Sequence, residues 1–190
     1  MTRSKRASRR PLRLRGGLAA TGLAAALLTA LPAAPASASQ QAVPGAVLIQ
    51  NAGFRGYVLC ANADNESVYV KPIDTRDRFC TWVQISSGPA QIMYNVGKDQ
   101  VMAYTGGNEG AVVMEDEKRT PSGQTPNTQL WSWGGEEGWG GLALQSYSDS
   151  GQNVDAKATD GDYPRTDAVR TRGWRHGHQR ELTWNPIPLR

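Results

Sequence analysis

The sequence has few of the residues on which enzymes rely for catalysis. Its 190 residues include only two histidines, His176 and His178. It contains no G-x-S-x-G or H-E-x-x-H motif. The adjacent pair Glu136-Glu137 lies in a glycine-rich stretch, where nothing fixes the separation that two glycosidase carboxylates require. We therefore predict a protein that is not an enzyme and that needs no cofactor.

Long apolar runs are also scarce. Leu18 to Leu31 is the one such run, and its 14 residues fall short of the roughly 20 needed to span a bilayer. Seven Lys and Arg and no acidic residue occur in residues 1–38, and Ala36-Ser37-Ala38 has the small-x-small form of a cleavage site. This pattern predicts a cleaved secretory signal over residues 1–38 and a secreted, extracellular protein without a membrane span. Residues 8–12 resemble a twin-arginine signal, so both export routes stay open.

The basic charge of the chain belongs mostly to this leader. The whole sequence has a net charge of +4, with 21 Lys and Arg. Beyond residue 38, 14 basic groups face 17 acidic ones, which gives a net charge of about −3. This balance excludes a basic nucleic-acid binder. Residues 39–190 are enough for one domain with its own core.

Two cysteines, Cys60 and Cys80, both fall in this domain. An even number of cysteines in an exported chain favours a disulfide, and a pair of buried free thiols is the alternative. A disulfide closing a loop of about 20 residues would stabilise the fold by roughly 3 kcal/mol. The CxxC spacing of a zinc site is absent, and His176 and His178 lack a third ligand at a definite spacing. We therefore predict no metal site.

The domain shows no convincing helical periodicity, and its short apolar segments recur in three units. Trp82, Trp133 and Trp184 are each separated by 51 residues, which places the units at about 44–86, 90–137 and 139–188. Each unit holds four strand candidates separated by Gly, Asp, Asn or Pro. One unit cannot bury its apolar face alone, whereas three arranged around an axis can. The sequence therefore predicts an all-β fold, a β-trefoil of three pseudo-repeats of about 50 residues, with an irregular β-sandwich as the alternative.

Gln129-Leu130-Trp131 forms a Q-x-W motif, and the third unit contains Gly151 to Ala156, Asp160-Gly161 and His178-Gln179 before its closing Trp184. With these residues the chain resembles the ricin-B-type (Q-x-W) β-trefoil lectins over residues 44–188. In the register set by Trp133, Cys80 and Leu182 stand where the other units would have the tryptophan of this motif. The resemblance implies a non-catalytic, carbohydrate-binding protein.

The resemblance also implies where a sugar would bind. The family's pocket aspartate lies on the second strand of a unit, a position that we assign to Asp155 in the third unit. The same position is Asn62 in the first unit and Met102 in the second, which leaves one functional pocket. The expected site is completed by Trp174 as the aromatic platform and by His178 and Gln179 as polar partners. Alternatively, Asp155 is a solvated turn residue, Trp174 belongs to the core and His178 lies in a plain surface loop.

An arginine-rich segment, residues 170–180, departs from the family pattern. It holds four Arg, both His and Trp174. One hypothesis is an exposed loop for an anionic target such as an acidic glycan, since Arg forms paired hydrogen bonds with carboxylate or phosphate. The alternative is internal pairing with Asp160, Asp162 and Asp167.

A second polar segment, residues 120–127, suggests a function from a different class. An inhibitor would present such a loop to a protease in one rigid, extended conformation. A secreted β-trefoil protease inhibitor is therefore the alternative to the lectin hypothesis. A trefoil that has lost its sugar pocket and contacts proteins is a third possibility.

Overall fold

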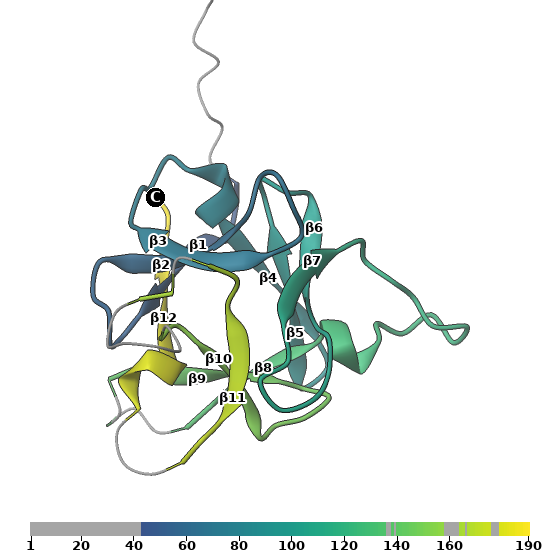
Figure 1. Cartoon of the computed structure of the whole chain (residues 1–190). Helices are drawn as coiled ribbons and strands as arrows, with labels where there is room; N and C mark the ends of the chain where they lie inside the picture. Colours follow the sequence, from purple (N-terminus) through teal and green to yellow (C-terminus); the bar gives the residue numbers. More distant parts are fainter. Residues whose placement is uncertain (1–42, 136–137, 139, 158–163, 166, 176–178) are drawn as a thin grey trace, which may run out of the picture. The chain divides into compact units, whose positions relative to one another are not determined.

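The protein folds as a closed barrel of strands with three hairpins attached (Figure 1). The computed structural model describes residues 43–135, 138, 140–157, 164–165, 167–175 and 179–190. The predicted leader, residues 1–38, lies outside this range. In the part of the chain that is described, no helix is long and apolar enough to cross a membrane.

Six strands form the barrel, and each pairs with two other barrel strands. The antiparallel pairings run from β12 to β1, then through β4, β5, β8 and β9, and β9 returns to β12. A closed ring leaves none of these strands with a free edge. The barrel strands are β1 (Ala46–Asn51), β4 (Trp82–Ser87), β5 (Ala90–Asn95), β8 (Trp131–Gly134), β9 (Leu142–Ser146) and β12 (Thr183–Pro188).

The three hairpins give the chain its threefold repeat. In each unit a barrel strand leads into a hairpin, then into a single-turn 3-10 helix, and then into a second barrel strand. This order confirms the predicted β-trefoil. The hairpins are β2 (Tyr57–Ala61) with β3 (Val68–Pro72), β6 (Gln100–Tyr104) with β7 (Val112–Glu115), and β10 (Gln152–Asp155) with β11 (Arg170–Gly173). The 3-10 helices are η1 (Arg78–Cys80), η2 (Asn127–Gln129) and η4 (Arg180–Leu182).

The hairpins contribute to the core because successive side chains on a strand point to opposite faces. In β2, Leu59 and Ala61 belong to the central core, which extends through the barrel. Val58 and Cys60 point the other way and pack into a smaller cluster with Leu48. Both faces of β2 are therefore buried, which explains why this strand is apolar almost throughout.

Three buried tryptophans mark equivalent positions in the three units. Trp82, Trp131 and Trp184 are each completely buried. Their Nε1 atoms donate hydrogen bonds to the carbonyl oxygens of hairpin residues: Trp82 to Leu59 at 2.8 Å, Trp131 to Met102 at 2.8 Å and Trp184 to Val154 at 3.0 Å. Each tryptophan thereby ties its second barrel strand to the hairpin of its own unit.

This arrangement corrects the sequence register, which took Trp133 as the marker of the second unit. Trp133 lies two residues further along β8, is only half-buried, and donates from Nε1 to Oε1 of Gln84 at 2.9 Å. The equal spacing of 51 residues was a coincidence, because the units differ in length. In the corrected register, Cys80, Gln129 and Leu182 are equivalent, since each ends a 3-10 helix two residues before the buried tryptophan.

Buried asparagine side chains fasten one unit to the next. Asn51 at the end of β1 donates from Nδ2 to the carbonyl oxygens of Glu181 at 2.9 Å and Thr183 at 3.2 Å. Asn95 at the end of β5 likewise donates to the carbonyl oxygen of Phe79 at 2.8 Å. In each case the Oδ1 atom accepts two backbone N–H groups of the following turn. These asparagines thus satisfy backbone groups at the junctions that would otherwise be buried without partners.

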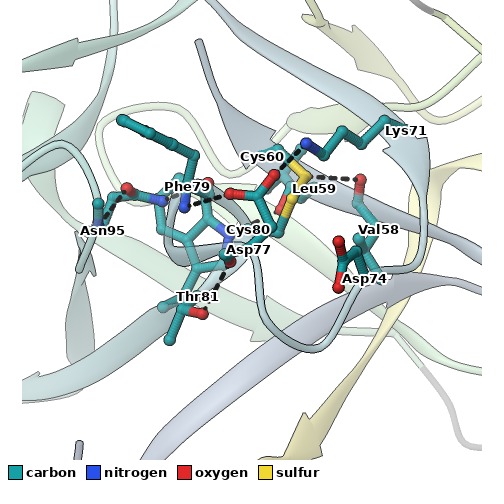
Figure 2. The surroundings of a disulfide bond; sticks show 12 residues. Val58, Leu59, Cys60, Lys71, Asp74, Asp77, Phe79, Cys80, Thr81 and Asn95 are labelled. Atoms are coloured by element: carbon teal, nitrogen blue, oxygen red, sulfur yellow. Dashed lines mark hydrogen bonds and ion pairs between the residues drawn. A yellow bond between two sulfur atoms is a disulfide. The ribbon is translucent and has the colours of Figure 1, made fainter. Parts of the chain in front are cut away.

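The first unit contains the predicted disulfide, between Cys60 in β2 and Cys80 in η1. Both residues are completely buried. Figure 2 shows that the ion pair between Lys71 and Asp77 lies beside the disulfide. The disulfide and the ion pair both join the first hairpin to the segment that leads into β4.

Candidate functional site

A hollow of about 300 Å³ lies on the third unit, beside hairpin β10–β11. We call it the hairpin hollow. Five of its lining side chains are cationic and three are anionic, and none of the described ones is aromatic. The lining residues are Glu109, Asp155, Lys157, Arg165, Arg170, Thr171, Arg172, Arg175, Gln179 and Glu181.

An ion-pair network forms part of the wall of the hairpin hollow. Arg172 donates from Nε to Oδ2 of Asp155 at 2.7 Å and from Nη2 to Oε1 of Glu181 at 2.8 Å. Oδ1 of Asp155 accepts the backbone N–H of Lys157 at 2.9 Å. Burial lowers the pKa of Arg172, but the hydrogen bond and charge of Asp155, helped by Glu181, outweigh it and raise that pKa above its usual value. The guanidinium group is therefore a permanent cation between two carboxylates.

The hairpin register explains how these residues meet. Asp155 faces Arg170 across the ladder, and Arg172 faces Asn153. Arg172 is therefore the diagonal neighbour of Asp155 on the same face, within reach of a long side chain. Glu181 comes from η4, which packs against β10, β1 and β12. The site thus depends on the hairpin and on the 3-10 helix that follows it in the same unit.

The structure brings two of the four predicted sugar-binding residues together. Asp155 and Gln179 both line the hairpin hollow. Gln179 is the residue before η4, and its Oε1 accepts the backbone N–H of Arg175 at 2.9 Å. Trp174 is half-buried and is not one of the described lining residues. His178, like His176, lies outside the described residues.

The tryptophan hydrogen bonds also identify the counterparts of Asp155 in the other units. Asp155 follows Val154, the acceptor from Trp184, so its equivalents follow Leu59 and Met102 and are Cys60 and Ala103. The sequence had matched Asp155 to Asn62 and Met102, and this register was wrong. In the first unit the position is occupied by the disulfide, and in the second by an alanine. The third unit is therefore the one that has a carboxylate at this position.

Sequence analysis missed the roles of Arg172 and Glu181. It expected the arginines of residues 170–180 either to be exposed or to pair with upstream aspartates. Arg172 instead pairs with Asp155 and Glu181, whereas Asp167 contacts Arg165 at 3.6 Å. Asp160 and Asp162 lie outside the described residues. The spacing of Arg170 and Arg172 could have suggested that these two share one face of a strand, but their placement on the face of Asp155 depends on the β10–β11 register.

Arg170 and Arg175 differ from Arg172 in their surroundings. Both side chains are exposed, and neither forms an ion pair within the described part of the chain. They line the same hollow as Arg172, which is held between two carboxylates. The hairpin hollow therefore combines a fixed ion-pair network with cationic groups that are available to a ligand.

The second polar segment, residues 120–127, folds back on itself. Thr120 donates its backbone N–H to the carbonyl oxygen of Gln124 at 2.8 Å, and Gly123 has a positive φ of 79°. The side chain of Arg119 is held by Glu117 and by Oγ1 of Thr125. This loop does not have the single extended conformation that we expected of an inhibitor, so the geometry does not favour that alternative.

Metal binding has little support in the described residues. No group of three or more His, Cys, Asp or Glu side chains in this part of the chain could hold a metal ion. His176 and His178, the histidines considered as metal ligands, lie outside the described residues.

Comparison with solved structures supports the fold. The designed 3-fold symmetric protein ThreeFoil matches with a TM-score of 0.62 and 12% identity, over 76% of this chain and 99% of that one. The Macrolepiota procera ricin B-like lectin, solved in complex with lactose, matches with a TM-score of 0.59 and 16% identity, over 77% and 98%. These identities are low, so the matches establish a β-trefoil fold without establishing a family.

A mosquitocidal holotoxin also matches, with a TM-score of 0.63 and 14% identity over 79% of this chain. The match spans 18% of the holotoxin. No protein-family model and no curated protein matches the sequence.

Proposed function

We propose that this chain is an exported, non-catalytic carbohydrate-binding protein of the lectin type, and that it binds its ligand in the hairpin hollow. The observation that carries the proposal is that Asp155, Gln179 and the exposed Arg170 and Arg175 line one hollow of a β-trefoil. In the first and second units, the position of Asp155 is occupied by the disulfide-bonded Cys60 and by Ala103.

The hairpin hollow offers both kinds of hydrogen-bonding group that sugar hydroxyls require. Asp155 and Glu181 retain lone pairs beyond those used by Arg172 and the Lys157 N–H. Arg170 and Arg175 supply N–H donors. Paired hydroxyls both donate and accept, so adjacent carboxylates and guanidinium groups can replace the water that these hydroxyls lose on binding.

The charge of the hairpin hollow favours glycans that carry an acidic group. Five cationic against three anionic side chains leave a net charge of +2 in the described lining. No described lining residue provides an aromatic platform for the apolar face of a neutral sugar. Recognition therefore depends on charge more than on stacking, which fits a carboxylated or sulfated glycan.

A glycan array run at two salt concentrations tests this proposal. The probe is the labelled domain, residues 39–190, beside two variants of the hollow, D155N and R170A/R175A. Binding to acidic glycans should weaken in R170A/R175A, because two cations are lost, and at high salt, because the attraction is screened. D155N removes the carboxylate that accepts sugar hydroxyls and orients Arg172, so it should reduce the discrimination between acidic glycans of equal charge. The variant R76A/K118A removes two cations from exposed sites with 88% and 59% side-chain exposure, and should bind like the unmodified domain.

Two results would overturn the proposal. One is a blank array with a folded domain. The other is binding that D155N and R170A/R175A leave unchanged while both variants keep the circular dichroism spectrum of the folded domain.

Export is tested separately. If residues 1–38 are a cleaved signal, the protein recovered from the culture medium should have the mass of residues 39–190. Recovery of the uncleaved chain from the cytoplasm alone would contradict export. Blocking the twin-arginine route alone would distinguish the two export pathways.

A further inference from the structure

A second hollow, of about 360 Å³, lies where the first and third units meet. We call it the turn hollow, because the turn between β1 and β2 forms one of its walls. Residues from the end of β1, from this turn, from η4, from β12 and from the connection before β9 line it. They are Gln50, Asn51, Ala52, Arg55, Gly140, Arg180 and Asn185.

The walls of the turn hollow are held together by a rigid frame. The Gly53 N–H donates to the carbonyl oxygen of Arg180 at 3.1 Å, and Asn51 binds the carbonyl oxygens of Glu181 and Thr183. A Cβ at Gly53 would lie 2.9 Å from the backbone nitrogen of Glu181, so the turn packs directly on η4. On a third side, Asn185 donates from Nδ2 to the carbonyl oxygen of Gly140 at 3.1 Å.

Two arginines line this hollow, Arg55 from the β1–β2 turn and Arg180 from η4. Both are exposed, and neither forms an ion pair with another described residue. The described lining includes no carboxylate. Two like charges that face one hollow repel each other, and an anion placed between them removes that repulsion. The chemistry of the turn hollow therefore suits a carboxylate or sulfate group.

The two hollows are neighbours through η4. Arg180 lines the turn hollow and the next residue, Glu181, lines the hairpin hollow. Their Cα atoms are about 3.8 Å apart, so the hollows flank a single turn of backbone. In Figure 1, η4 is the short yellow helix of the third unit.

We propose that the turn hollow is a second anion subsite, and that the two hollows bind successive acidic groups of one polyanionic glycan across η4. This inference rests on the proposed function of the hairpin hollow. Arg170 and Arg175 hold one acidic group, while Arg55 and Arg180 hold another. The proposed ligand is thereby narrowed from a sugar with one acidic group to a glycan chain that carries acidic groups repeatedly.

The test measures affinity against chain length. The probes are heparin-derived oligosaccharides of two, four, six and eight sugars, titrated against the domain by calorimetry. Affinity should rise steeply once the chain spans both hollows, by roughly ten- to hundredfold, because the second contact becomes intramolecular. The variant R55A/R180A should lose this rise while keeping the affinity for the disaccharide.

The two proposals fail in different ways. If R55A/R180A shows the same length dependence as the unmodified domain while R170A/R175A loses binding, the second subsite is excluded and the first remains. If neither variant changes binding, or if the unmodified domain binds none of the probes, both are overturned. The variant R76A/K118A loses the same charge at sites outside both hollows. If it loses the length dependence equally, overall charge causes that dependence and the second subsite is excluded.

Discussion

Trp131 and Trp133 lie on one strand, and replacing each with alanine should have very different effects on stability. Trp131 is completely buried and its Nε1 donates to the Met102 carbonyl oxygen. Its removal leaves a cavity and a buried carbonyl group without a partner, so Trp131→Ala should cost about 3–5 kcal/mol of unfolding free energy. Trp133 is half-buried, and part of its ring is already in water. Trp133→Ala should cost about 1–2 kcal/mol.

The measurement is urea unfolding of both variants followed by far-ultraviolet circular dichroism, which does not depend on tryptophan emission. For a domain of this size, a loss of 3–5 kcal/mol corresponds to a fall in Tm of roughly 6–20 °C. A Trp133→Ala variant as unstable as Trp131→Ala would refute the assignment of Trp131 as the second-unit counterpart of Trp82 and Trp184.

Three further predictions concern the disulfide, one glycine and alkaline pH. Replacing both Cys60 and Cys80 with alanine should lower the free energy of unfolding by about 3 kcal/mol, because the closed loop of about 20 residues is released in the unfolded chain; an unchanged urea midpoint would contradict this. Gly97→Ala should cost about 1–3 kcal/mol, because its Cβ would lie 2.6 Å from the Phe79 backbone nitrogen, whereas Gly138→Ala, with nothing within 4 Å, should be nearly neutral. Burial raises the pKa of Tyr104. The stabilisation that this neutral phenol provides is complete below its unfolded pKa of about 10 and is lost as pH rises through the higher folded pKa. The free energy of unfolding should therefore fall at strongly alkaline pH, and it should fall less steeply with pH in Tyr104→Phe; equal slopes for the two proteins would contradict this.

Much of the fold could be predicted from sequence because strand segments and turns are local features. The apolar segment of β2 and the Gly-containing turn after β1 appear in the sequence without knowledge of any partner strand. The disulfide could be predicted because the chain has two cysteines, which leave one possible pairing, and its leader predicts export. The threefold order of strands followed from recurrence, which is also visible in the chain alone.

The register within the repeat could not be fixed in this way. Trp131 and Trp133 have the same chemistry and point to the same side of β8, so no local pattern distinguishes them. What separates them is the hydrogen bond from Trp131 to Met102, which joins residues 29 positions apart. The expected counterparts of Asp155 were wrong as well: Asn62 lies just after the end of β2, and Met102 lies one residue before the true counterpart, Ala103.

The candidate site shows the same limit. Sequence analysis identified Asp155 and Gln179, and the structure places both at one hollow. It did not predict that Arg172 would lie between Asp155 and Glu181, because that arrangement depends on the β10–β11 register and on how η4 packs against the hairpin. The turn hollow could not be predicted from the sequence either, since Arg55 and Arg180 are 125 positions apart.

The pairing of β1 with β12 has a consequence for how the domain could be rearranged. Val47 lies opposite Pro188, and the Leu189 N–H donates to the Ala46 carbonyl oxygen at 2.9 Å. The two ends of the domain are thus neighbours, and a short linker could join them. The loop around Ser122 is exposed and takes no part in the barrel. A circular permutant opened at that loop would keep every barrel pairing. It would also place every described lining residue of both hollows except Glu109 within one uninterrupted stretch of chain, from Gly140 through β12 to the β1–β2 turn.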